Sequence, residues 1–172
     1  MNDFRKKHIL VIGFGEDHCT TEAYNLAFEV GKEIAKHGAI LITGGLGGVM
    51  EAASKGAKEE GGLVVGIIPF DSKEFANQFC DVVISTGIGF ARDFITAYTA
   101  DAVIVIGGGV GTLIEACVAY QKLKPIVALV NSGGVAEKIA DKYLDDRRLI
   151  KVIGEKDPKK AVETALRLIE KS

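Results

Sequence analysis

Cysteine is scarce in this sequence, and its spacing argues against two kinds of site. The chain has 172 residues and three cysteines, Cys19, Cys80 and Cys117, which are far apart. An odd number of cysteines without a CxxC pair argues against a disulfide framework and against a zinc site. We therefore expect three reduced thiols in a cytoplasmic protein that holds no metal.

Long hydrophobic runs and an excess of charge of one sign are also lacking. No apolar stretch approaches the roughly 20 residues that span a bilayer. The apolar run near the N-terminus is short and leads into glycines and acidic residues, unlike a signal peptide. The formal net charge is −2, which disfavours a broad attraction to nucleic acid or to an anionic membrane. We expect neither of these partners.

Several cofactor and nucleotide motifs are absent as well. The P-loop pattern GxxxxGK[ST] does not occur, which disfavours an ATPase or a GTPase. In the two nearest approaches to the dinucleotide fingerprint GxGxxG, Thr112 and His18 stand where the last glycine should be. No acidic residue follows the second predicted strand to hold the ribose of NAD, and no lysine is suited to a pyridoxal Schiff base. We expect no cofactor and no lysine decarboxylase activity.

Glycine is abundant, and apolar runs of strand length alternate with longer segments of helical period. The 21 glycines are about twice the usual share. The predicted strands are continuous Val, Ile and Leu runs, which indicates a parallel sheet with helices on both faces. We expect an α/β fold: one Rossmann-like, doubly wound, nucleotide-binding domain over residues 1–172, with a mostly parallel sheet of about seven strands.

The boundaries of the predicted elements follow from these runs and from capping residues. The predicted strands span His8–Ile12, Ala39–Thr43, Leu63–Ile68, Val82–Ser85, Ala102–Ile106, Ile126–Val130 and Ile150–Val152. The predicted helices span Thr21–Lys36, Gly48–Glu60, Phe90–Thr99, Gly111–Lys122 and Val135–Tyr143, with a last helix after Asp157. Gly38 suits a left-handed C-terminal cap, and Asp157 with Pro158 suits a helix start.

Three glycine-rich turns each follow a predicted strand and precede a predicted helix. They span Gly13–His18, Thr43–Gly48 and Gly107–Thr112. Glycine lets the backbone approach a ligand, and a helix N-terminus offers unpaired N–H groups beside a positive dipole end. Because ligands of open α/β sheets bind at the carboxyl ends of the strands, the turns predict a phosphate-binding crevice. The alternative is that these glycines serve only tight turns and close packing.

Two of the glycine motifs resemble those of a known family. The chain resembles the "lonely guy" family in three places: the segment Gly44–Pro69, Arg92, and the run GGGVGTLIE (Gly107–Glu115). In that family the motif PGGxGTxxE follows an arginine. Its members are cytokinin-activating phosphoribohydrolases, often mislabelled lysine decarboxylases. The resemblance covers Ile9 to about Val130. Gly107 replaces the leading proline and Asp93 the usual lysine after the arginine, as in a short prokaryotic branch and in the related molybdenum cofactor carrier proteins.

The resemblance implies hydrolysis of the N-glycosidic bond of a nucleoside 5′-monophosphate, which yields a free base and ribose 5-phosphate. Arg92 and Glu115 would then be the catalytic pair. Phosphate would be held by Gly108, Gly109, Gly111 and Thr112, and the opposite wall of the crevice would contain Gly44, Gly45, Gly47 and Gly48. With Gly13 and Gly15 of the first turn, these form the predicted binding site. The alternative function is a carrier that binds a nucleotide or a pterin phosphate without turnover.

The residue types suit this chemistry, but each has a simpler interpretation. A carboxylate can stabilise an oxocarbenium-like state or deprotonate water, and the arginine fork can bind phosphate or the leaving base. Thr112 and Glu115 also form the capping-box pattern TxxE, in which Glu115 would only close its helix. Arg92 could be an exposed arginine paired with Asp93 or Asp101.

We expect a homodimer or a homotetramer. Four aromatic side chains lie on two neighbouring predicted helices: Phe90, Phe94, Tyr98 and Tyr120. They could belong to the core that faces the sheet or to a seam between subunits. The resemblance adds that family members are commonly dimers, with the site near the interface.

Overall fold

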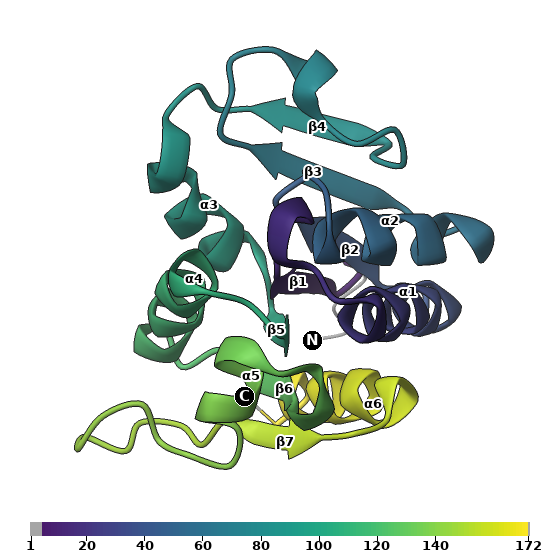
Figure 1. The fold of residues 1–172 in the computed structure, drawn as a ribbon. Helices are drawn as coiled ribbons and strands as arrows, with labels where there is room; N and C mark the ends of the chain where they lie inside the picture. The colour runs from purple at the N-terminus through teal and green to yellow at the C-terminus, as the bar shows by residue number, and fades with distance from the viewer. Residues whose placement is uncertain (1–4, 172) are drawn as a thin grey trace.

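The strands of a computed structural model, which describes residues 5–171, form one parallel sheet (Figure 1). They are β1 (His8–Gly13), β2 (Ile40–Thr43), β3 (Val64–Ile68), β4 (Val82–Ser85), β5 (Ala102–Ile106), β6 (Ile126–Leu129) and β7 (Ile153–Glu155). Their order is β4-β3-β2-β1-β5-β6-β7, and each neighbouring pair is parallel. The predicted Rossmann-like α/β fold is confirmed.

Helices cover both faces of the sheet (Figure 1). One face carries α1 (Thr21–Lys36), α2 (Val49–Glu59) and α6 (Pro158–Ile169), and the other carries α3 (Arg92–Thr99), α4 (Val110–Gln121) and α5 (Gly134–Ile139). Alternate strand side chains enter two separate cores. In β1, Ile9 and Val11 pack towards α1 and α2, whereas Leu10 and Ile12 pack towards α4 and α5. Burial on both faces explains the continuous apolar runs.

The direction of strand addition reverses next to β1. From β1 the chain adds β2, β3 and β4 on one side, and then it crosses over to place β5 on the other side of β1. At this junction Gly13 of β1 pairs with Ile106 of β5. Such a reversal leaves a crevice at the carboxyl ends of the strands, which is where the glycine turns lie.

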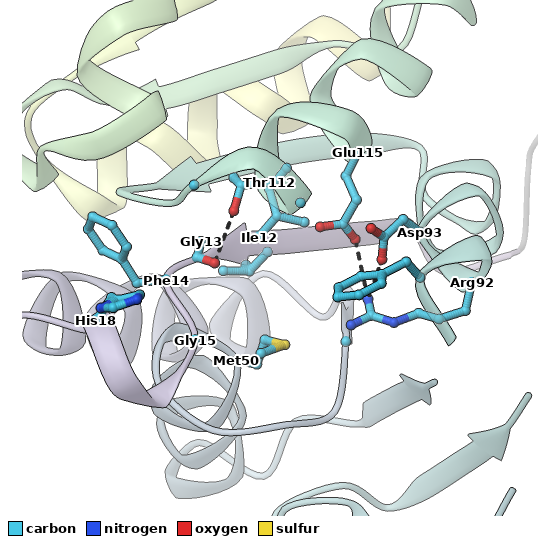
Figure 2. Close-up of a pocket in the computed structure, with 15 residues that line it drawn as sticks. Ile12, Gly13, Phe14, Gly15, His18, Met50, Arg92, Asp93, Thr112 and Glu115 are labelled. Atoms are coloured by element: carbon cyan, nitrogen blue, oxygen red, sulfur yellow. Dashed lines mark hydrogen bonds and ion pairs between the residues drawn. The ribbon is translucent and has the colours of Figure 1, made fainter. Parts of the chain in front are cut away.

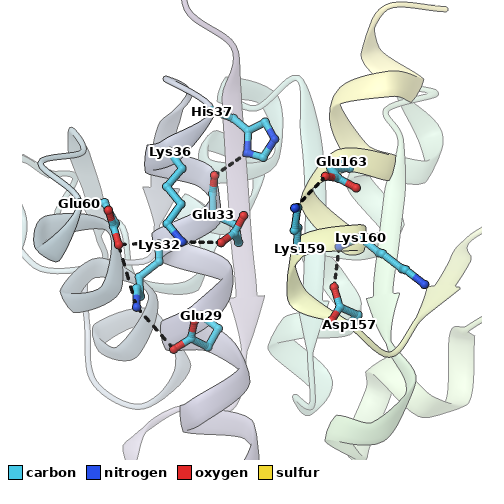
Figure 3. Close-up of polar contacts among 10 residues, drawn as sticks. All are labelled: Glu29, Lys32, Glu33, Lys36, His37, Glu60, Asp157, Lys159, Lys160 and Glu163. Atoms are coloured by element: carbon cyan, nitrogen blue, oxygen red, sulfur yellow. Dashed lines mark hydrogen bonds and ion pairs between the residues drawn. The ribbon is translucent and has the colours of Figure 1, made fainter.

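Helix boundaries follow the capping residues. Gly38, directly after α1, has φ +70°, the left-handed conformation that glycine adopts without strain. The side chain of Asp157 accepts a hydrogen bond from the backbone N–H of Lys160 at 2.9 Å, and Pro158 is the first residue of α6 (Figure 3). Both capping predictions are confirmed.

Two predicted elements beside the β7 edge of the sheet differ from the structure by several residues. The predicted edge strand Ile150–Val152 is wrong, because the N–H of Val152 donates to the carbonyl of Lys142, and the edge strand β7 spans Ile153–Glu155. Helix α5 ends at Ile139 rather than Tyr143, because Asp141 takes a positive φ of 59°. Neither difference reaches the glycine turns.

The single domain that the sequence predicts over residues 1–172 stays a prediction, and residues 1–4 and 172 lie outside the described residues. Within residues 5–171, none of the helices has the length and apolar character that crossing a membrane requires.

Candidate functional site

A cavity opens at the carboxyl edge of the sheet, beside the ends of β1, β2 and β5 (Figure 2). Its volume is about 300 Å³, within the range of small-molecule sites. The first glycine turn and the first turns of α3 and α4 form much of its wall. The predicted site residues that line it are Gly13, Gly15, Gly44, Arg92, Gly109, Gly111, Thr112 and Glu115.

The first turn of α4 has unused hydrogen-bond donors at the cavity. Gly109 precedes the helix with an extended backbone, and no side chain caps the helix start. Among residues 5–171, no acceptor pairs with the backbone N–H groups of Val110, Gly111 and Thr112. Free N–H groups and the positive end of the helix dipole together favour an anion. This end of the cavity can therefore bind a phosphate oxygen through the backbone.

Thr112 contributes differently from its backbone neighbours. Its hydroxyl donates a hydrogen bond to the carbonyl oxygen of Gly13 at 3.0 Å (Figure 2). The side chain therefore joins the start of α4 to the end of β1, and its proton is already used within the protein. The backbone N–H of Thr112, rather than its hydroxyl, is the donor that remains for a ligand.

The third glycine turn requires glycine for its own conformation. Gly107 and Gly108 have φ values of +61° and +95°, in the left-handed region. A Cβ on Gly107 would lie 2.1 Å from the ring of Phe14, and one on Gly108 would lie 2.5 Å from the side chain of Thr112. Gly108 does not line the cavity, so its observed role is to shape the turn that leads into α4.

Gly44 borders the cavity and lies against Arg92. A larger residue at this position would displace the arginine. A Cβ there would lie 2.7 Å and 2.8 Å from the two terminal guanidinium nitrogens of Arg92, and 2.6 Å from the sulfur of Met50. The guanidinium thus packs directly on the backbone at the end of β2. A Cβ on Gly15, in contrast, would have no other side chain or backbone segment within 4 Å and would face open space.

The remaining glycines of the second turn do not line the cavity. They are Gly45, Gly47 and Gly48. A Cβ on Gly45 would contact Ile68 at 2.5 Å, and one on Gly48 would lie 2.5 Å from the carbonyl oxygen of Phe14. The observed role of these two glycines is close packing between the first two turns and β3. For these two positions the packing interpretation accounts for the sequence.

Arg92, Asp93 and Glu115 form a buried charged cluster across α3 and α4, which we call the Arg92 cluster. The Nη1 atom of Arg92 lies 3.1 Å from Oδ1 of Asp93 and 3.6 Å from Oε1 of Glu115 (Figure 2). The three residues are 8%, 3% and 7% exposed. The alternative interpretation of Arg92 as an exposed arginine is therefore wrong, although the pairing with Asp93 that it included is confirmed. The Nε atom of Arg92 is buried without a hydrogen-bond partner in the described chain.

Burial makes both carboxyl groups of the Arg92 cluster weaker acids. Desolvation raises the pKa of Glu115 from 4.5 to about 7, although the hydrogen bond from Thr96 and the charge of Arg92 oppose the shift. Burial also raises the pKa of Asp93, against the effect of Arg92. Both protonation states of Glu115 are thus accessible near neutral pH, which is what a general acid or base requires.

Glu115 does not cap its own helix. Helix α4 begins at Val110, so Thr112 already lies within the first turn and cannot serve as the N-cap residue. The carboxyl group of Glu115 instead accepts a hydrogen bond from the hydroxyl of Thr96 on α3 at 2.6 Å. The capping-box interpretation is therefore wrong, and the carboxyl group belongs to the cavity wall.

Several residues that line the cavity were not part of the site predicted from the sequence. They include the apolar side chains of Phe14, Met50 and Phe90, and the buried hydroxyl of Thr96 is adjacent. Thr96 follows Arg92 by one helical turn, and this spacing could have predicted that both side chains lie on the same face of the helix. Among the described residues, no group of three or more His, Cys, Asp and Glu side chains could hold a metal ion.

The fold and the cavity define a Rossmann-like α/β protein with a glycine-rich, partly charged site at the topological switch point. The chain belongs to the SLOG cluster4 family, whose model matches residues 6–162. An uncharacterized protein from Archaeoglobus fulgidus is 49% identical over 119 residues, which cover 69% of this chain and 77% of that protein.

Two further kinds of relative match the predicted resemblance. The cytokinin riboside 5′-monophosphate phosphoribohydrolase of Mycobacterium tuberculosis is 42% identical over 98 residues, 55% of this chain and 52% of the enzyme. The match thus spans about half of that enzyme. The molybdenum cofactor binding protein of Rippkaea orientalis is 33% identical with a TM-score of 0.86, over 96% of this chain and 99% of that one. The molybdenum cofactor carrier protein of Chlamydomonas reinhardtii is 35% identical with a TM-score of 0.83, over 98% and 100%.

Proposed function

We propose that the cavity binds a small phosphorylated ligand of nucleotide type, with its phosphate at the first turn of α4. The observation that carries this proposal is the row of unpaired N–H groups at Val110, Gly111 and Thr112, at the positive end of a helix dipole. Both kinds of named relative support it, since each name refers to a phosphorylated nucleotide or to a cofactor.

We propose further that the protein hydrolyses the N-glycosidic bond of a nucleoside 5′-monophosphate. The bond between C1′ and the base nitrogen breaks, and a water oxygen bonds to C1′. Glu115 takes one proton from this water and passes it to the leaving base nitrogen, so Glu115 is regenerated and the products are a free base and ribose 5-phosphate. Arg92 would neutralise charge on the phosphate or on the leaving base.

The position of Glu115 supports this reaction. Its carboxyl group lies in the cavity wall on the same helix that offers the free N–H groups, one turn further along. A pKa of about 7 lets the group accept a proton and release it again near neutral pH. In a protein that only binds its ligand, the role of Glu115 would be limited to pairing with Arg92.

The test is a release assay with a panel of purine and pyrimidine monophosphates, in which chromatography detects the free base. We expect one class of nucleotide to release its base, and Glu115→Gln to reduce the rate by about 100-fold or more. Glu163→Gln, an exposed glutamate on α6, is the matched control and should keep the full rate. Equal rates for wild type and Glu115→Gln would contradict the catalytic assignment.

A carrier of a pterin phosphate or nucleotide is the second candidate. It is favoured by the similarity to molybdenum cofactor binding and carrier proteins over nearly the whole chain. Gly107 and Asp93 also replace the hydrolase residues of the motif. Native mass spectrometry of gently purified protein distinguishes the two functions. An intact ligand that remains bound without any base release would favour the carrier.

We propose that the protein forms a homodimer, or a tetramer of two such dimers, through α3 and α4. Tyr120 is buried in the core, whereas Phe90, Phe94 and Tyr98 are 83%, 49% and 50% exposed. On α4, Val110 adds an apolar side chain that is 76% exposed. Sedimentation at micromolar concentration should give at least twice the mass of one chain, and a monomer would contradict the proposal.

A further inference from the structure

The hydroxyl of Thr96 has two oxygen neighbours and a single proton. Thr96 is completely buried. Its Oγ1 atom lies 2.8 Å from the carbonyl oxygen of Asp93, within α3, and 2.6 Å from Oε1 of Glu115, on α4. One hydroxyl proton cannot be donated fully to both oxygens. The state of Glu115 therefore decides the direction of the second bond.

Two arrangements satisfy these distances. When Glu115 is ionised, Thr96 donates its proton to the carboxylate. When Glu115 is protonated, its own proton can be donated to Oγ1, and Thr96 then donates to the carbonyl of Asp93. The hydroxyl can rotate between these two acceptors because its hydrogen has no other fixed position. Thr96 can thus stay bonded to Glu115 in either protonation state.

We propose that Thr96 is the positioning residue that holds Glu115 in place and sets the balance between its two protonation states. The proposal deepens the proposed function and rests on Glu115 being the acid or base of that site. Oε1 of Glu115 faces Thr96 and Arg92, and no hydrogen bond of the described chain engages Oε2. Thr96 thereby orients the carboxyl group so that one oxygen is left for the ligand or for water.

The direction of the effect follows from bond strength. A hydrogen bond to an ionised acceptor is stronger than one between neutral groups, so the Thr96 bond favours the carboxylate. This agrees with the lowering effect of Thr96 on the pKa of Glu115. The charged groups that act on the Glu115 carboxyl are Arg92, which is 3.6 Å away, and Asp93, both on α3, and His18 also lines the cavity.

A simpler interpretation is that Thr96 only bonds to its own helix. Thr99, on the same helix, is the matched example, because its hydroxyl donates to the carbonyl of Ile95 at 2.7 Å and has no other partner among the described residues. If Thr96 were purely structural, its substitution, like that of Thr99, would have no specific effect on the titration of Glu115.

The test is a 13C NMR titration of the Glu115 carboxyl group in the unliganded protein. We expect Thr96→Val, which keeps the shape but removes the hydroxyl, to raise the pKa of Glu115 by about one unit. Thr96→Ser should restore the wild-type titration, and Thr99→Val should leave it unchanged. If Thr96→Val does not fold, Thr96→Ala also removes the hydroxyl and should raise the pKa of Glu115 in the same way.

An unchanged or lower pKa in Thr96→Val, or a serine variant that behaves like valine, would overturn the proposal. The titration needs neither ligand nor turnover. If the protein released no base from any nucleotide, the proposed reaction would be contradicted, but the effect of Thr96 on the titration of Glu115 could still be measured. If hydrolysis does occur, the acid limb of its pH profile should move to higher pH by the same amount in Thr96→Val, since Glu115 must lose its proton to act as a base.

Discussion

Oppositely charged side chains meet in two contrasting regions of this molecule. On the surface of α6, Lys159 and Glu163 are 3.9 Å apart, and their side chains are 65% and 48% exposed (Figure 3). In the Arg92 cluster, the same kinds of group are at most 10% exposed (Figure 2). Water screens the first pair, which therefore stabilises the fold little. Burial removes this screening, so the charges of the Arg92 cluster depend on pairing with one another. Burial also raises the pKa of the Glu115 carboxyl group towards neutral pH.

Removal of the positive charge should have the largest effect and should separate the two regions most clearly. Arg92→Met leaves two buried carboxyl groups unpaired, and we expect it to lower the free energy of unfolding at pH 8 by about 4 kcal/mol. Lys159→Met should lower it by about 0.5 kcal/mol or less. Urea denaturation measures both values. Similar losses in the two variants would show that the burial difference has no energetic consequence.

The pH dependence of stability should be the next largest effect. Because the pKa of Glu115 is raised from 4.5 to about 7 on folding, the folded protein holds this proton more tightly than the unfolded chain. Its contribution to stability is therefore fully present below pH 4.5 and is lost as the pH rises through 7. Glu115→Gln should abolish this loss, so its stability relative to wild type should increase by about 3 kcal/mol between these limits.

Urea denaturation at several pH values from 4.5 to 8 tests this prediction. Glu163→Gln is the exposed counterpart, and its effect should stay within about 0.5 kcal/mol of wild type throughout. Parallel stability curves for wild type and Glu115→Gln would contradict the account of a buried, proton-binding carboxyl group.

A smaller effect should come from the wall against which Arg92 packs. Gly44→Ala places a methyl group within 2.8 Å of both terminal guanidinium nitrogens, so we expect the arginine to shift and stability to fall by about 2 kcal/mol. Gly15→Ala also changes a glycine of the cavity wall but meets no atom within 4 Å, so it should change stability little. Thermal unfolding compares the two. An equal loss in both variants would show that the fit around the guanidinium is not what requires glycine at position 44.

Much of the fold could be predicted because its determinants are local. Continuous apolar runs, the glycine after α1 and the Asp-Pro start of α6 depend on neighbouring residues alone. Boundaries failed where a distant partner decided them, as when Val152 bonds to Lys142 rather than joining β7. The β7 edge of the sheet was therefore the least predictable part, whereas the β4 edge was predicted with its observed bounds.

The candidate site was only partly predictable for the same reason. The glycine motifs identified the turns that surround the cavity, but they could not separate the glycines that line it from those, such as Gly45 and Gly48, that serve packing. The partner of Glu115 lies 19 residues away on another helix, so no local pattern distinguishes this contact from a capping box. Burial, which sets the pKa of the carboxyl group, is likewise a property of the assembled layers.

Above all, we propose that the first turn of α4 binds phosphate through its backbone. An amide NMR titration of the protein with ribose 5-phosphate tests it most directly. We predict saturable shifts that are largest at the N–H signals of Gly109, Val110, Gly111 and Thr112. Saturable shifts that are largest elsewhere, or no saturable shift at all, would contradict the account.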